Sequence, residues 1–266
     1  MYRSAQINKY KVTLEYDGGR YSGWQKQPER RTVQGILIDS AKQIFPSSSI
    51  DIQGSGRTDK GVHALGQIAH FAVDGKMNPD ILRLKWNDLL PADINILKIE
   101  SAGKNFHARH DAIARSYIYQ ISRRRSAFGK DCTWWIKDRL NIANMQNCAP
   151  LFTGMHDFVS FTDKDVEKNE TRVQVEKLEV LDFDPIILVH IKASHFLWKM
   201  VRRIVGVLAE VGRGKMSSSE VDFLINNRSD VPARYTPPPS GLFLHTVYFR
   251  DTDVTGEIKP TMNFTL

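Results

Sequence analysis

The amino-acid sequence predicts an α+β protein made of two successive units with a mostly antiparallel sheet. Within the first hundred residues, strand and helix patterns follow the order strand, helix, strand, strand, helix, strand, which is the split β-α-β order of a ferredoxin-like unit. The second half partly repeats this order. With 266 residues, of which 41% are hydrophobic, the chain is long enough for one large or two small cores.

The first unit contains four strand patterns and two helix patterns. Thr32 is placed to cap a helix that ends near Phe45, because apolar residues recur at helical spacing after it. Pro79 opens the second helix, whose apolar stripe consists of Leu82, Trp86, Leu89 and Leu90. The strands are expected at residues 10–17, where apolar and polar side chains alternate, and at 50–52, 67–73 and 94–100.

The second unit is expected to pair a similar sheet with two helices. Asp184-Pro185 is a turn signal between two strand patterns and predicts a hairpin. One helix is expected over 139–153, and a second carries a broad apolar face from Phe196 to Val211. The strands are expected at residues 115–122, 171–183, 186–193 and 242–249. The predicted domains are 1–103, 104–251 and a C-terminal tail, 252–266.

Charge and cysteine content narrow the functional classes. The net charge of +7 and the bunched arginines suit a polyanionic partner, although a well-solvated basic surface is an equal alternative on these numbers alone. Cys132 and Cys148 form no CxxC pair, so we interpret both as ordinary buried thiols and expect no metal site. Without a long apolar run or a secretory leader pattern, the chain is expected to be soluble, cytoplasmic and free of membrane contact.

The stretch GSGRTDKGVHALGQ, residues 54–67, is the most unusual part of the sequence. It lacks the Lys-Ser/Thr pair of a phosphate loop and the third glycine of a dinucleotide fingerprint, so no nucleotide cofactor is expected. It displays Asp59 between the cations Arg57 and Lys60, directly before an apolar strand. A carboxylate flanked by cations stays ionised, which suits a nucleophile or a base. Turn chemistry alone is the alternative explanation.

Seven blocks of the sequence, in this order, resemble the successive blocks of the tRNA pseudouridine synthase A family. The resemblance extends from about Tyr10 to Tyr248, and its most specific part is GRTDKGVHA. The blocks are YDGGRYSGWQKQP (16–28), TVQG (32–35), GSGRTDKGVHALGQ (54–67), FHARHDAIARSYIY (106–119), GMHDFVSF (154–161), HFLWKMVRRIVGVLAEVG (195–212) and PPPSGLFL (237–244).

The resemblance implies a pseudouridine synthase fold with a central RNA-binding cleft, and an enzyme that isomerises uridine within tRNA. In this family the bond from N1 to C1′ breaks, the base rotates, and C5 joins C1′, with no cofactor and no metal. The implied partners are tRNA and a second copy of the chain in a homodimer. The implied target is the anticodon stem-loop, at tRNA positions 38 to 40. Trp198, Lys199 and the triple proline depart from many relatives and could change which uridines are chosen.

The resemblance also assigns roles to individual residues. Asp59 is the catalytic aspartate, which either attacks the ribose carbon or removes a neighbouring ribose proton. Arg202 pairs with it, unless it is simply a solvated arginine like its neighbours. Tyr117 stacks on the target base, unless it is a core tyrosine. The implied substrate-binding residues are Arg57, as a wedge in the RNA and a phosphate contact or as a second partner of Asp59, together with Arg109, Lys60, and the apolar pocket wall formed by Leu242 and Leu244.

Phosphate contacts that read no base are expected at Arg20, Lys26, Arg30, Arg31, Arg109 and residues 123–125.

Other functional hypotheses stay open. One alternative is a synthase of the same fold with a different tRNA target, and another is a non-catalytic RNA-binding module. An RNA glycosidase is a third, but it normally needs two carboxylates at the scissile bond, whereas this block offers one.

Overall fold

The computed structural model describes residues 7–163, 170–250 and 257–262, and these form an α+β fold with a mostly antiparallel, mixed sheet. The chain divides into two compact units. Unit 1 contains the described residues up to Ile113 and again from Leu244 to 250, and unit 2 contains those from Ala114 to Phe243 and 257–262. These bounds differ from the domains expected at 1–103 and 104–251 and the tail expected at 252–266, and the ferredoxin-like description of the first two stays a prediction.

The sheet of unit 1 is built around strand β1, Ile7–Tyr16, as the alternating pattern predicts. Tyr10, Val12, Leu14 and Tyr16 are all buried, and the residues between them are more exposed. β1 pairs antiparallel with β3, His63–Asp74, on one side and with β4, Ile94–Ala102, on the other. The short strand β2, Ile52–Gly54, pairs with β3.

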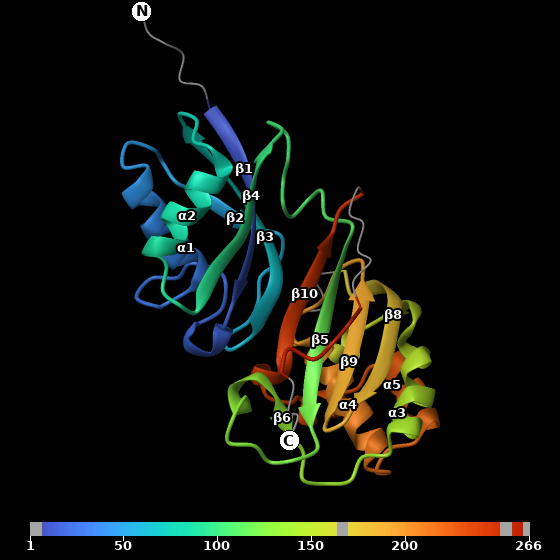
Figure 1. Ribbon diagram of the computed structural model, residues 1–266. Helices are drawn as coiled ribbons and strands as arrows, with labels where there is room; N and C mark the ends of the chain where they lie inside the picture. The colour runs from blue at the N-terminus through green and yellow to red at the C-terminus, as the bar shows by residue number, and fades with distance from the viewer. Residues whose placement is uncertain (1–6, 164–169, 251–256, 263–266) are drawn as a thin grey trace, which may run out of the picture. The chain divides into compact units, whose positions relative to one another are not determined.

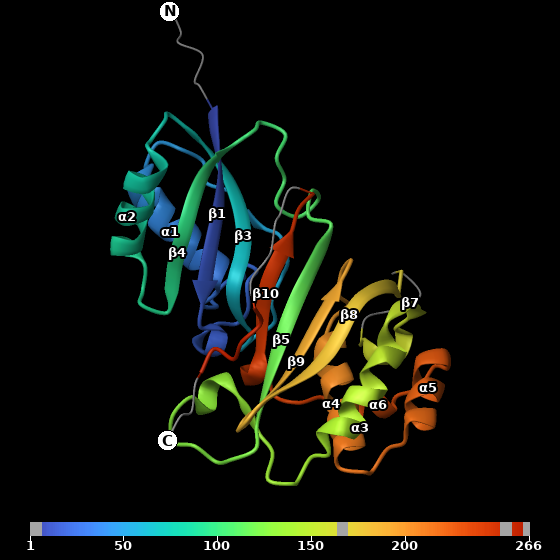
Figure 2. The same cartoon turned by 45° about the vertical axis from the view of Figure 1, so that its right-hand side comes forward.

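Two helices pack on one face of this sheet (Figures 1 and 2). Helix α1, Val33–Ile44, begins where Thr32 accepts a hydrogen bond from the backbone N of Gly35, as predicted for this cap. Helix α2, Pro79–Leu89, buries Leu82 and Trp86. Its expected stripe was too wide, because Leu89 lies at the end of the helix and is exposed.

The sheet of unit 2 contains the predicted hairpin. β8, Arg172–Phe183, and β9, Ile186–Ala193, pair antiparallel across the Asp184-Pro185 turn. β9 pairs on its other side with β5, Ala114–Ser122. β7, Gly154–Asp157, extends the sheet beyond β8, and β6, Trp134–Trp135, adds a parallel pairing to β5. The sequence reasoning identified neither β6 nor β7, both of which are short.

Helices also accompany this second sheet (Figure 2). α3 spans Ile142–Cys148 and is shorter than the expected 139–153, because Asn141 caps its start and Pro150 lies in a separate 3-10 turn. α4 spans Met200–Gly212, so Phe196 precedes it, contrary to expectation. The remaining elements of the described residues are the unpredicted helices α5, Ser218–Asn226, and α6, Val231–Arg234, and the 3-10 turns Gly18–Arg20, Lys130–Cys132, Ala149–Phe152, Val159–Phe161 and Pro239–Gly241.

Strand β10, Leu242–Tyr248, lies where the last strand is predicted. The division between the units falls inside it, after Phe243. Within unit 1 β10 is a neighbour of β3, and a side chain at Gly66 would lie 2.7 Å from the carbonyl oxygen of His245. Such an approach leaves room for glycine alone.

Part of the expected tail, 252–266, is described, and this part docks on unit 2. Thr261 donates a backbone hydrogen bond to Oε1 of Gln120 at 2.7 Å, and Nε2 of Gln120 donates to Oγ1 of Thr261 at 2.8 Å. The side chain of Gln120 is fully buried in β5. Residues 252–256 and 263–266 lie outside the described residues.

Candidate functional site

The loop between β2 and β3 carries Asp59. Its neighbours Arg57 and Lys60 are exposed, Thr58 is buried, and Asp59 itself is half-buried. The backbone N of Val62 donates to the carbonyl oxygen of Asp59 at 3.1 Å, which closes a tight turn. The loop therefore presents one carboxylate between two solvent-exposed cations, the arrangement that the sequence pattern predicts.

The segment that follows β1 holds this loop in place through the backbone. The backbone N of Trp24 donates to the carbonyl oxygen of Thr58 at 3.0 Å. Gly23 has φ of +93°, and a side chain there would lie 2.7 Å from the same carbonyl oxygen and 3.2 Å from the carbonyl carbon of Asp59. The first block of the resemblance thus packs directly against the aspartate loop, and only glycine fits at this contact.

Buried polar side chains brace the loop from beneath. The hydroxyls of Tyr16 and Thr58 are 2.8 Å apart and share a hydrogen bond, and Nε2 of Gln67 donates to the carbonyl oxygen of Gly56 at 2.9 Å. All three side chains are buried. Burial raises the pKa of Tyr16 to about 12, against smaller opposing effects of its hydrogen bonds with Thr58 and Gln67. Tyr16 therefore stays a neutral hydroxyl that anchors the loop.

Tyr117, the proposed stacking residue, lies in β5 of unit 2. It is about nine-tenths buried, and its ring meets that of Phe196 edge to face, with centroids 4.9 Å apart. Phe196 comes from the non-helical segment between β9 and α4. The ring of Tyr117 is thus held in a fixed orientation by an aromatic neighbour, while the expected role in base stacking stays a prediction.

Arg202 is the one residue of α4 that is not buried. Its Nε and Nη2 donate to the carbonyl oxygen of Pro237 at 2.8 and 2.5 Å. Tyr119 donates its hydroxyl proton to the next carbonyl, that of Pro238, at 2.7 Å. Burial raises the pKa of Tyr119, and the nearby charge of Arg202 opposes this effect. The triple proline therefore supplies two backbone acceptors beside Arg202.

The cations that flank Arg202 have a different environment from the one expected. Lys199 and Arg203 both contact the carboxylate of Asp163, Lys199 through Nζ at 2.6 Å. Arg203 is buried and also donates to the carbonyl oxygen of Ser160 at 3.2 Å, and burial lowers its pKa. Both neighbours are thus engaged in structural ion pairs rather than solvated. They therefore no longer support the alternative that Arg202 is simply a solvated arginine like them.

The other predicted substrate-binding residues lie in both units. Leu242 belongs to unit 2 and Leu244 to unit 1, and both are buried in β10. Arg109, in unit 1, is exposed, and its backbone N donates to Nδ1 of His107 at 3.2 Å. Of the cations expected at phosphates, Arg31 pairs with Asp93 and Arg123 with Asp182 and Asp184.

Sequence reasoning missed the groups that position these residues. Thr58 and its partner Tyr16 lie in two different blocks of the resemblance, 42 residues apart, and only the alternation of β1 pointed to a buried tyrosine. The carbonyl of Pro237 and the carboxylate of Asp163 gave no signal, because a backbone acceptor has no sequence pattern and Asp163 lies just beyond the block that ends at residue 161.

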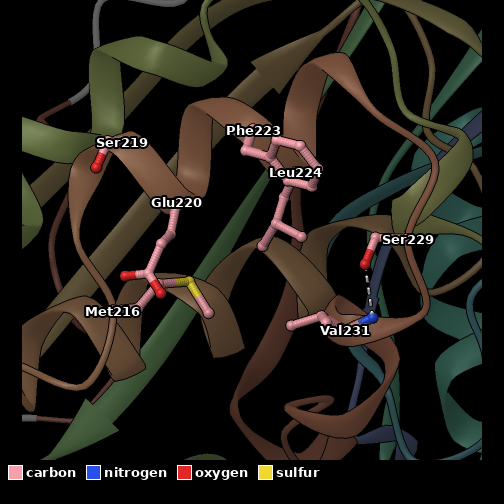
Figure 3. A pocket seen from close by; sticks show the side chains of 7 residues that line it. All are labelled: Met216, Ser219, Glu220, Phe223, Leu224, Ser229 and Val231. Carbon is pink, nitrogen blue, oxygen red and sulfur yellow. Dashed lines mark hydrogen bonds between the residues drawn. The ribbon is translucent and has the colours of Figure 1, made fainter.

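Other features of the described residues bear on the class of site. A cavity of about 330 Å³ lies beside α5, but the predicted catalytic residues do not line it (Figure 3). Its lining residues are Met216, Ser219, Glu220, Phe223, Leu224, Ser229 and Val231.

Among residues 7–163, 170–250 and 257–262, no group of His, Cys, Asp and Glu could hold a metal ion, and no helix is long and apolar enough to span a membrane. Cys148 is buried, but Cys132 is only half-buried, contrary to expectation.

Comparisons with known proteins identify close relatives. The profile of a family described as tRNA pseudouridine synthase matches residues 13–111 and 148–250. The protein named tRNA pseudouridine synthase A from Thermodesulfovibrio yellowstonii is 36% identical over 251 residues, covering 90% of this chain and 98% of the relative. That of Ruminiclostridium cellulolyticum is 36% identical and that of Bartonella tribocorum 34%, each covering 91% of this chain and 100% of the relative. A solved dye-decolorizing protein from V. cholerae has a TM-score of only 0.19 and 8% identity, which says nothing about the fold.

Proposed function

The chain belongs to the tRNA pseudouridine synthase family, and from this premise we propose that it converts uridine to pseudouridine within tRNA through the carboxylate of Asp59. The observation that carries the proposal is the family match across 13–111, which contains the whole aspartate loop. The enzyme is accordingly an isomerase whose substrate is tRNA.

The reaction redistributes bonds within one nucleotide. The N1 to C1′ bond breaks, the base rotates, a bond from C5 to C1′ forms, the proton of C5 passes to solvent, and N1 gains a proton. Asp59 either attacks C1′ or takes a proton from the neighbouring ribose carbon. Both routes need the ionised carboxylate, and the exposed cations Arg57 and Lys60 beside it favour that form. The braced loop supports this assignment because a fixed carboxylate loses little entropy when it reacts.

We propose that Arg202 and Tyr117 serve the same reaction. Nε and Nη2 of Arg202, which both donate to the carbonyl oxygen of Pro237, lie on one edge of the guanidinium. This contact sets the plane of the guanidinium before substrate binds. Tyr117 offers a flat apolar ring with a polar tip, which is the chemistry needed to hold a uracil that has left its stack. Arg57, Lys60 and Arg109 would contact the RNA, since all three are exposed, and Leu242 and Leu244 would form the apolar wall.

Several finer features belong to the proposal. These are two ferredoxin-like units that form a pseudouridine synthase fold around a central RNA-binding cleft, a target in the anticodon stem-loop, a homodimer, and action in the cytoplasm. The exposed cations of both units support an RNA-binding role, because phosphate contacts depend on accessible positive charge.

Release of tritium from tRNA labelled at uridine C5 tests the proposed function. Isomerisation must release the label, because C5 loses its hydrogen when it bonds to C1′. The wild-type chain should release it in proportion to the pseudouridine found in digested product. Binding without release would indicate an RNA-binding module, and free uracil among the products would indicate a glycosidase. Sequencing the modified tRNA then identifies the target position.

A further inference from the structure

Two aromatic side chains of unit 2 are exposed in one short segment, residues 123–139. Phe128 is 79% exposed, the largest exposed fraction among the large apolar side chains that the structure describes, and Trp135 is 44% exposed. Isolated exposed apolar residues are ordinary, but two aromatics of this size within one loop region call for a physical reason.

Strand pairing turns Trp135 outward. β6 runs parallel to β5, with Ile121 opposite Trp134 and Ser122 opposite Trp135. The ring of Trp134 packs edge to face on Tyr119, with centroids 6.2 Å apart. Because successive side chains of a strand point to opposite faces, Trp135 points away from that packing. Its exposure is therefore fixed by the sheet rather than by a loose loop.

Hydrogen bonds also fix the base of the loop that carries Phe128. Gly129 follows it with φ of +66°, and its carbonyl oxygen accepts from the backbone N of Cys132 at 3.0 Å and from Oγ1 of Thr133 at 3.2 Å. The buried Gln120 donates to the carbonyl oxygen of Cys132 at 2.8 Å. Phe128 is thus held on an anchored turn, although its ring contributes almost no buried surface to folding.

Cations outnumber carboxylates in the segment that carries the two rings. Arg123, at the start of the segment, is neutralised by Asp182 and Asp184, and Asp138 is engaged by Arg213 at 2.7 Å. The guanidinium carbon of Arg125 lies 5.9 Å from the ring centroid of Trp135. The other cations of the segment are Arg124, Lys130, Lys137 and Arg139, against the single further carboxylate of Asp131.

We propose that the 123–139 segment is a stacking platform for unpaired nucleotides of the tRNA, with bases on Phe128 and Trp135 and phosphates on the surrounding cations. Exposed aromatic faces interleaved with cations are what proteins use to hold single-stranded RNA, because every base has a face that can stack. An interface with another protein would instead be expected to have few charges at its centre. This inference rests on the proposed function in that it takes tRNA as the substrate.

The double variant Phe128→Ala/Trp135→Ala tests the platform in the full chain. Its dissociation constant for an unmodified tRNA transcript, measured by fluorescence anisotropy, should rise about tenfold or more. The slope of log Kd against log salt should not change, because no charge is removed. Phe128→Tyr/Trp135→Phe should bind like the wild type. Phe223→Ala is the matched control, since it removes an aromatic ring that is 58% exposed in α5 of the same unit.

Removing charges from the platform should instead change the salt dependence of tRNA binding. Arg124→Ala/Arg125→Ala should lower the salt slope by about 0.7 for each RNA phosphate that the variant no longer neutralises. The proposal is wrong if Phe128→Ala/Trp135→Ala binds tRNA within twofold of the wild type or no worse than Phe223→Ala. It is also wrong if the double variant changes the sedimentation of the RNA-free protein, which would indicate an interface between copies of the chain. Catalysis is measured in a separate assay, as tritium release by the wild type at saturating tRNA. If the wild type binds tRNA through the platform but releases no tritium, only the proposed function is contradicted.

Discussion

Gly23 shows how much of the aspartate loop depends on one missing side chain. Gly23→Ala combines a left-handed φ of +93° with a carbon 2.7 Å from the carbonyl oxygen of Thr58. The loop must move to accommodate it, and Asp59 moves with the loop. We expect single-turnover tritium release to fall at least about tenfold, because small displacements of a reacting group are costly, while tRNA affinity stays within about threefold.

Gly75→Ala is the matched control for this prediction. Gly75 also has a left-handed φ, +87°, but a side chain there would meet open space. Both variants should lose roughly 1–2 kcal/mol of stability from backbone strain. Only Gly23→Ala should lose activity, and an equal loss in both variants would show that strain, rather than displacement of the loop, is responsible.

His70 introduces a pH dependence into the stability of unit 1. Its side chain is buried in β3, and Nδ1 accepts a hydrogen bond from the backbone N of Ala108 at 3.2 Å. Burial lowers the pKa of His70 to about 4, with smaller lowering effects of His107 and Lys9 that the carboxylates of Asp51 and Asp111 oppose. Between pH 6.5 and 4 the unfolded chain therefore binds a proton that the folded chain does not.

The free energy of unfolding should accordingly fall by about 1–3 kcal/mol between pH 7 and pH 4.5 on account of this group. His70→Asn removes the titration and keeps an acceptor for Ala108, so urea unfolding of that variant should lose less stability over the same pH range. His110→Asn, at an exposed position of unit 1, is the control. If His70→Asn loses as much stability as the wild type, burial of this imidazole is not the source.

At the scale of the elements, the docked C-terminal segment is expected to stabilise unit 2. Removing residues from 257 onward takes away both bonds between Thr261 and the buried amide of Gln120. We expect the truncated chain to lose about 1–3 kcal/mol of stability, since the buried Oε1 of Gln120 loses the donor that Thr261 supplies. Chemical denaturation monitored in unit 2 measures this loss. No loss of stability on truncation would contradict the docking.

The sequence predicts the long elements well because their burial is regular. Tyr10 and Val12 in β1, and Thr32 before α1, are placed by periodicity and capping alone. α5 was missed although Ser217 and Glu220 form a capping box, because the helix is short and its apolar face is narrow. The start of α4 was placed too early, since Lys199, directly before the helix, adopts a left-handed φ of +62°.

At the scale of the whole molecule, the sequence identifies the residues of the candidate site but not the contacts that hold them in place. The block around Asp59 is specific enough to identify the family, which the profile over 13–111 and 148–250 confirms. The partners that fix each group are long-range contacts, as between Arg202 and Pro237, 35 residues apart, and no local pattern encodes them. Asp59 belongs to unit 1, whereas Tyr117 and Arg202 belong to unit 2, so their joint role comes from the resemblance and stays a proposal.

The central claim is that one carboxylate performs the chemistry, and a single-turnover comparison of Asp59→Asn with the wild type tests it most directly. With tRNA labelled at uridine C5 and enzyme in excess, Asp59→Asn should bind tRNA within a few-fold of the wild type and release tritium at least about 100-fold more slowly. Asp51→Asn, which changes an exposed aspartate just before β2, should release it at the wild-type rate. Tritium release by Asp59→Asn at a rate close to that of Asp51→Asn would contradict the account.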